Sequence, residues 1–95
     1  MARVALLSER FLRSRARLGI VPGSERGLAV ARTIAALLAA EELPGPSDTV
    51  AAIPPTGTAL VRRVPGRNLW LWYRVEGNTV LLRHVSSEPP VPIDE

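Results

Sequence analysis

The segment WYRVEGNTVLL, residues 72–82, restricts the fold of this 95-residue chain more than any other. Gly77 and Asn78 separate two runs rich in β-branched and aromatic residues, a pattern typical of a hairpin closed by a two-residue turn. Such a turn places Glu76 opposite Thr79 and so predicts the register of the whole hairpin. Counting back from the turn, one face pairs Val75 with Val80, Tyr73 with Leu82, Leu71 with His84 and Leu69 with Ser86. The other face pairs Arg74 with Leu81, Trp72 with Arg83 and Trp70 with Val85.

The two faces of this hairpin differ in chemistry. The face of Leu69, Leu71, Tyr73 and Val75 is the better core, so we expect helices to cover it. The other face carries Trp70, Trp72 and Arg74, with Trp72 and Arg83 placed to form a cation–π pair. Aromatic and arginine side chains are common in binding hot spots and stack on unpaired bases. Trp70, Trp72 and Arg74 are therefore predicted to bind nucleic acid or a protein partner. In the alternative interpretation, both indoles pack under residues 44–58 or in a homodimer.

The first half of the chain predicts one strand and two helices. Residues 2–7 form a short apolar run typical of a strand. Ser8 caps a helix that ends at Gly19, and Ser24 caps a longer helix that runs to about Leu43. The alanines of the longer helix predict a close approach of the first helix.

The second half predicts a loop followed by three strands. The Pro- and Gly-rich residues 44–58 predict a loop, and the strands follow at 59–64, 69–76 and 79–86. The order is strand, helix, helix, strand, strand, strand. It predicts an α+β domain, in which two N-terminal helices pack on one face of a mostly antiparallel four-stranded sheet.

Length, charge and cysteine content limit the class of protein. Ninety-five residues make one domain, 1–95, in which residues 86–95 are a Pro-rich acidic tail. The absence of cysteine excludes a disulfide framework and a cysteine-based metal site. The net charge is +3, and all twelve basic residues are arginine. Because the tail holds three of the nine acidic residues, the body of the chain is near +6, which suits a nucleic acid or an acidic protein.

No segment indicates a membrane protein or a secreted protein. The most apolar stretch, Leu28 to Ala40, is interrupted by Arg32 and is too short to span a bilayer. The N-terminal apolar run is too short for a secretory signal, and arginines surround it. We therefore expect a cytoplasmic protein with no membrane partner.

Few residues suit acid–base or metal chemistry. His84 is the only histidine, and a lone histidine in a strand is more often a packed residue than a general base. No second histidine and no paired carboxylates are spaced to build a metal site, and no acid completes a triad with His84 and Ser86 or Ser87. The sequence predicts no metal and no cofactor.

Two segments resemble the RelE/ParE toxin superfamily of bacterial type II toxin–antitoxin systems. LSERFLRSRARL, residues 7–18, looks like the family's basic first helix, and VRRVPGRNLWLWYRVEGNTVLLRHV, residues 61–85, looks like its C-terminal sheet. The resemblance covers about residues 2–86. It implies a toxin held in check by a cognate antitoxin protein. In the RelE branch the toxin is a metal-independent endoribonuclease that cuts messenger RNA on the ribosome, and in the ParE branch it inhibits DNA gyrase.

The resemblance also implies which residues act. In the ribonucleases a cluster of basic side chains on the open sheet face activates the ribose 2′-hydroxyl and stabilises the phosphorane. Arg62 and Arg63 match the family's basic pair, Arg67 lies near its next arginine, and Arg83 lies on the last strand. The family's further catalytic residues follow that strand, where this chain has SSEPPVPIDE with no base and no ring. Whether the chain is an enzyme therefore stays open, and the alternative is a non-catalytic, degenerate toxin-fold module that binds a peptide, a protein or a second copy through Trp70 and Trp72.

Overall fold

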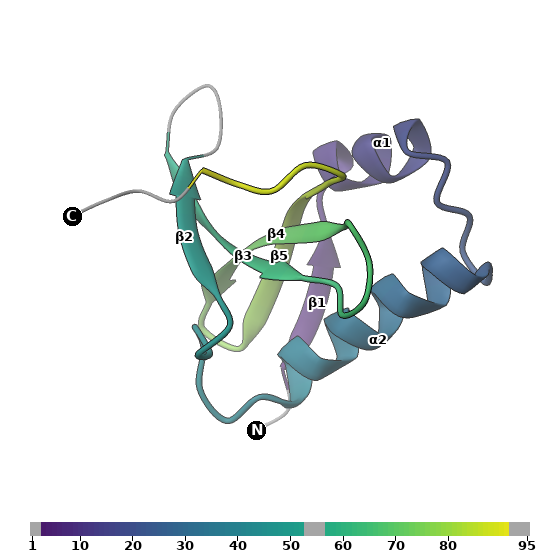
Figure 1. Ribbon diagram of the computed structural model, residues 1–95. Helices are drawn as coiled ribbons and strands as arrows, with labels where there is room; N and C mark the ends of the chain where they lie inside the picture. The colour runs from purple at the N-terminus through teal and green to yellow at the C-terminus, as the bar shows by residue number, and fades with distance from the viewer. Residues whose placement is uncertain (1–2, 53–56, 92–95) are drawn as a thin grey trace.

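A computed structural model describes residues 3–52 and 57–91 and shows an α+β domain (Figure 1). The helices and strands are, in chain order, β1 (Val4–Leu7), α1 (Glu9–Arg17), α2 (Glu25–Ala39), β2 (Thr49–Ala52), β3 (Thr58–Arg63), β4 (Trp70–Glu76) and β5 (Thr79–Ser86). The predicted helices and the four predicted strands are present. The second helix ends at Ala39, short of the predicted Leu43.

The sheet has five strands in the order β1-β5-β4-β3-β2. Strand β1 pairs with β5 in parallel, and the other neighbours are antiparallel. The prediction of four strands was wrong because β2 lies inside the segment 44–58 that was expected to be a loop. Residues 49–52 pair with residues 58–61 of β3, and this pairing with the next strand overrides the turn signal of the surrounding prolines.

Both helices begin at the predicted serines. Ser8 Oγ accepts the Phe11 N–H at 3.1 Å, and Ser24 Oγ accepts the Gly27 N–H at 3.1 Å. These bonds satisfy N–H groups that a helix start leaves without a partner. Two cap residues thus set where α1 and α2 begin.

The helices cover one face of the sheet, as Figure 1 shows. Phe11 of α1 and Val30 and Leu37 of α2 are buried in one cluster with side chains of the sheet, among them Leu69, Leu71, Tyr73, Val80 and Leu82. The prediction that the face of Leu69, Leu71, Tyr73 and Val75 is the core is confirmed, with Val75 only partly buried against the cluster. By contrast, Ala31, Ala35, Ala36 and Ala39 of α2 are exposed, so the predicted role of the alanines in packing against α1 is wrong.

The register of the β4–β5 hairpin matches the prediction only near its turn. The pairs from Glu76 with Thr79 to Tyr73 with Leu82 are as expected. A bulge then inserts Arg83, so the remaining pairs become Trp72 with His84, Leu71 with Val85 and Trp70 with Ser86. The predicted pairing of Trp72 with Arg83 is therefore wrong, and so are those of Leu71 with His84, Leu69 with Ser86 and Trp70 with Val85. The bulge places Val85 in the core, where an apolar side chain costs less to bury than an imidazole.

Neither helix in the described part of the chain combines the length and apolar character that crossing a membrane requires.

Candidate functional site

The adjacent arginines Arg62 and Arg63 of β3 lie on opposite faces of the sheet. Arg62 pairs with Leu71 and Arg63 with Trp70. Successive strand residues alternate between faces, so the side chains of the two arginines leave β3 on opposite faces of the sheet. Arg62 belongs to the face that the helices cover, whereas Arg63 belongs to the face of the tryptophans.

Arg62 is held by Asp48, which lies just before β2. The Asp48 side chain is fully buried, and that of Arg62 is 17% exposed. Arg62 Nε donates to Asp48 Oδ1 at 2.6 Å, and Arg62 Nη2 donates to Oδ2 at 2.9 Å. The Tyr73 hydroxyl and the Gly45 N–H also donate to Oδ2, at 2.7 and 2.6 Å. A side chain at Gly45 would meet Arg62 Nη2 at 2.8 Å, so this glycine leaves the space that the pair needs.

Asp48 and Arg62 each stabilise the charged form of the other. Burial alone would raise the pKa of Asp48, but the hydrogen bonds from Arg62, Tyr73 and Gly45 outweigh it and lower that pKa. The hydrogen bond to Asp48 raises the pKa of Arg62, while burial and the nearby carboxylate raise that of Tyr73. At neutral pH the pair is therefore an ionised, internally neutralised contact between β3 and the segment before β2.

Arg63 forms the exposed basic contact of the other face. Its guanidinium carbon lies 5.5 Å from the ring centroid of Trp70, within cation–π range. Its Nε donates to the Arg67 carbonyl at 2.9 Å, and Nη2 donates to Asn68 Oδ1 at 3.1 Å. The loop after β3 thus holds Arg63 over Trp70, which is itself half-buried.

Trp72 is a packed residue. It is 8% exposed and clusters with Ala51 of β2 and with Ala59 and Val61 of β3. Its Nε1 donates to Ser86 Oγ at 3.0 Å, so the polar atom of the ring is satisfied within the chain. In the alternative interpretation, the segment 44–58 covers the indoles. Strand β2 belongs to this segment, and the contact of its Ala51 with Trp72 agrees with that interpretation for Trp72.

The remaining predicted arginines are spread over the molecule. Arg67 forms an ion pair with Glu25 at the start of α2, at 3.3 Å, and Arg74 forms one with Glu76 at 3.5 Å. Arg83 is half-buried at the bulge of β5. Because Arg62 lies on the helix face, the structure does not gather Arg62, Arg63, Arg67 and Arg83 into one array.

His84 faces Trp72 rather than the helix side of the hairpin. The two rings meet edge to face, with centroids 5.9 Å apart. Burial, and then the charges of Arg10 and Arg17, lower the pKa of His84, so the ring is neutral at pH 7. Its Nδ1 is buried and has no hydrogen-bond partner among the described residues. His84 also borders a hollow of about 380 Å³ with Ser14, Arg17, Ser86 and Ser87.

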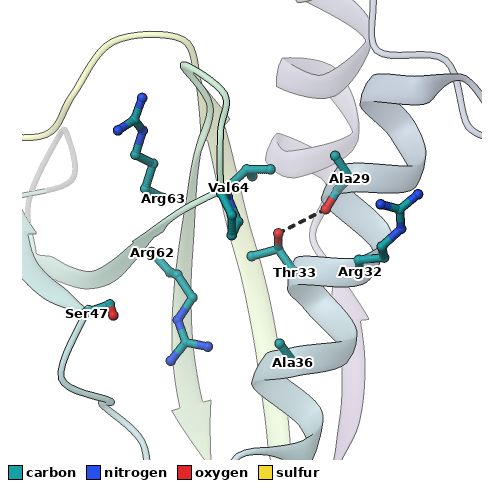
Figure 2. A pocket seen from close by; sticks show the side chains of 9 residues that line it. Ala29, Arg32, Thr33, Ala36, Ser47, Arg62, Arg63 and Val64 are labelled. Atoms are coloured by element: carbon teal, nitrogen blue, oxygen red, sulfur yellow. Dashed lines mark hydrogen bonds between the residues drawn. The ribbon is translucent and has the colours of Figure 1, made fainter.

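A second hollow lies between helix α2 and the end of strand β3, and we call it the α2–β3 cleft (Figure 2). Its volume is about 390 Å³. Its lining residues are Ala29, Arg32, Thr33, Ala36, Ser47, Arg62, Arg63, Val64 and Pro65. Arg32, Ser47 and Asp48 were not among the site residues predicted from the sequence. The available signal was Arg32, which interrupts an apolar helix, together with Asp48, the only acid between Glu42 and Glu76.

Among residues 3–52 and 57–91, no group of three or more histidine and acidic side chains is placed to hold a metal ion. Comparisons of the chain with protein-family models, with curated proteins and with solved structures found no match.

Proposed function

We propose that this chain is the toxin of a bacterial type II toxin–antitoxin pair, and that it acts in the cytoplasm by binding its target rather than by cutting RNA. The observation that carries the proposal is the sheet face opposite the helices, where Arg63 stacks on Trp70 and Arg74 is exposed. Aromatic and arginine side chains on a rigid strand suit recognition of a macromolecule. The order strand, helix, helix and C-terminal antiparallel strands agrees with the resemblance to RelE/ParE toxins.

Binding is favoured over cleavage because of where the arginines lie. Metal-independent cleavage needs several cations aimed at one phosphorane. Arg62 lies on the opposite face and is neutralised by Asp48, while Arg67 pairs with Glu25. A protein target such as DNA gyrase therefore fits this surface better than messenger RNA on the ribosome, and a cognate antitoxin would cover it before release.

The second candidate is a toxin-fold module that binds a protein, a peptide or another copy without poisoning the cell. The dispersal of the arginines and the burial of Trp72 favour it. Since Trp72 is already covered within the chain, such a module would present Trp70 as its only partly exposed indole.

Inducible expression in a related bacterial host tests the proposal. We expect growth arrest, with no new 5′ ends on messenger RNA and with inhibition of purified gyrase. Arg63→Ala and Trp70→Ala should relieve the arrest, whereas Arg13→Ala on α1 should not, although it removes the same charge. No arrest at verified soluble expression would contradict a toxin and favour the binding module. New messenger ends that disappear in Arg63→Ala would instead establish a ribonuclease.

A further inference from the structure

We infer that the α2–β3 cleft binds a small ligand that carries a carboxylate or phosphate group on a compact apolar body. The cleft holds about 390 Å³, which is within the range of small-molecule sites. Arg63 is the one lining residue that also belongs to the sheet face proposed to meet a macromolecule, and the other lining residues lie outside that face, so binding here does not depend on a toxin function.

The apolar part of the site is formed by small side chains. Ala29, Thr33 and Ala36 follow one another at helical spacing along the side of α2 that faces β3, and Val64 and Pro65 lie on the other wall. Because these helix residues are small, α2 and β3 leave a hollow between them. Thr33 donates its hydroxyl proton to the Ala29 carbonyl at 2.9 Å, so it can offer the ligand only an acceptor. The walls therefore suit a compact apolar group.

The polar part of the site is a preorganised guanidinium. In Figure 2 the Arg62 side chain extends into the gap between Ser47 and α2. Asp48 engages Nε and one N–H of Nη2, which leaves the N–H groups of Nη1 without a partner among the described residues. A guanidinium that is only 17% exposed and firmly oriented loses little freedom when it donates these bonds to an acceptor.

The charge of the lining selects an anion. The lining has three arginines and no carboxylate. Asp48, which is not part of the lining, neutralises the charge of one of them, Arg62. In Figure 2 Arg32 extends from the rim on the α2 side, away from Arg62. Arg32 is exposed and has no hydrogen bond or ion pair with the described residues, so its long side chain can turn over a bound anion. Charge-assisted hydrogen bonds from Arg62 and Arg32 would then hold the anionic group at one end of the cleft.

Titrations with three matched probes test this site. Benzoate and phenyl phosphate carry the two anionic groups on the same ring, and benzyl alcohol is their neutral counterpart. We expect shifts of amide NMR signals at Ala29, Thr33, Ala36 and Val64, with at least one anion binding about tenfold more tightly than the alcohol. The tighter anion identifies whether the natural ligand carries a carboxylate or a phosphate.

Variants that leave the Asp48 pair intact complete the test. Ala36→Leu fills the cleft and should abolish binding, while Arg32→Ala should weaken the anions about tenfold and leave benzyl alcohol unchanged. Arg13→Ala, on a helix that does not line the cleft, is the control and should bind as the wild type does. Equal affinity for all three probes, shifts located elsewhere, or full binding by Ala36→Leu would overturn the inference.

Discussion

Replacing Asp48 by asparagine should be among the most destabilising polar substitutions in this chain. The buried carboxylate accepts four hydrogen bonds, two from Arg62 and one each from Tyr73 and Gly45. Asparagine keeps the shape, but it removes the charge and turns an NH2 group toward these donors. Arg62 is then left largely buried without a counter-ion.

The size of the effect follows from that geometry. Removing one partner of a buried ion pair costs about 3–5 kcal/mol, because the other charge remains buried and unpaired. A domain of this length has a free energy of unfolding of about 5–14 kcal/mol. Each lost kcal/mol lowers the Tm of such a domain by about 4–8 °C. We therefore expect Asp48→Asn to lower the Tm by at least about 12 °C.

Urea unfolding followed by tryptophan fluorescence measures this loss, since Trp72 is buried in the folded chain. Glu76→Gln is the matched control because Glu76 also pairs with an arginine, Arg74, but on the surface. It should change the free energy of unfolding by less than about 1 kcal/mol. The double variant Asp48→Leu with Arg62→Met removes both charges and should recover much of the loss.

Two results would refute the reasoning. An Asp48→Asn variant within about 1 kcal/mol of the wild type would show that the pair contributes no more than a surface contact. A double variant as unstable as the single one would show that the cost arises from lost hydrogen bonds or packing and not from an unpaired guanidinium.

Three further predictions concern single residues. The pKa of His84 is lower in the folded chain than its ordinary 6.5, so the unfolded chain takes up the proton first as the pH falls. Stability should therefore be full above pH 6.5 and decline below it, and urea unfolding of His84→Gln across this range should lack that step. Trp72→Phe should lower the free energy of unfolding by about 1–3 kcal/mol through the lost Ser86 bond and lost packing, and should shift the remaining emission, now from Trp70 alone, to longer wavelength. Ser14→Ala should cost about 1–3 kcal/mol in thermal unfolding, because Ser14 Oγ accepts the buried Val85 N–H at 3.1 Å and alanine offers that N–H no acceptor.

Local rules predicted most of the framework. Ser8 and Ser24 begin the two helices as helix caps do, and the Gly77-Asn78 turn sets the first pairs of the β4–β5 hairpin. The alternation of large apolar residues along β4 identified the face that meets the helices. Each of these features depends on residues that are neighbours in sequence or on the period of one strand.

The errors depend on contacts between different strands and on packing, which the composition of a single segment does not reveal. Strand β2 has only four residues, and pairing with β3 rather than its own composition makes it extended. The bulge at Arg83 cannot be seen from the turn, because a two-residue turn determines the register only until an extra residue enters. Either Val85 or His84 could lie opposite Leu71 in the core. The bulge places the apolar Val85 there.

The case of Arg62 shows how a simple rule could have replaced a family expectation. Two neighbouring residues of a strand face opposite ways, so Arg62 and Arg63 could not both lie on the open face. The one on the helix face had to find a buried counter-charge, because an unpaired guanidinium in a core is too costly. Asp48 supplies it from fourteen residues away, through a Pro- and Gly-rich segment whose path no local pattern predicts. The pairing with Asp48 also fixes the orientation of the Arg62 guanidinium, which lines the α2–β3 cleft. Under the inference drawn for that cleft, a residue expected to act on RNA would instead bind a small anion.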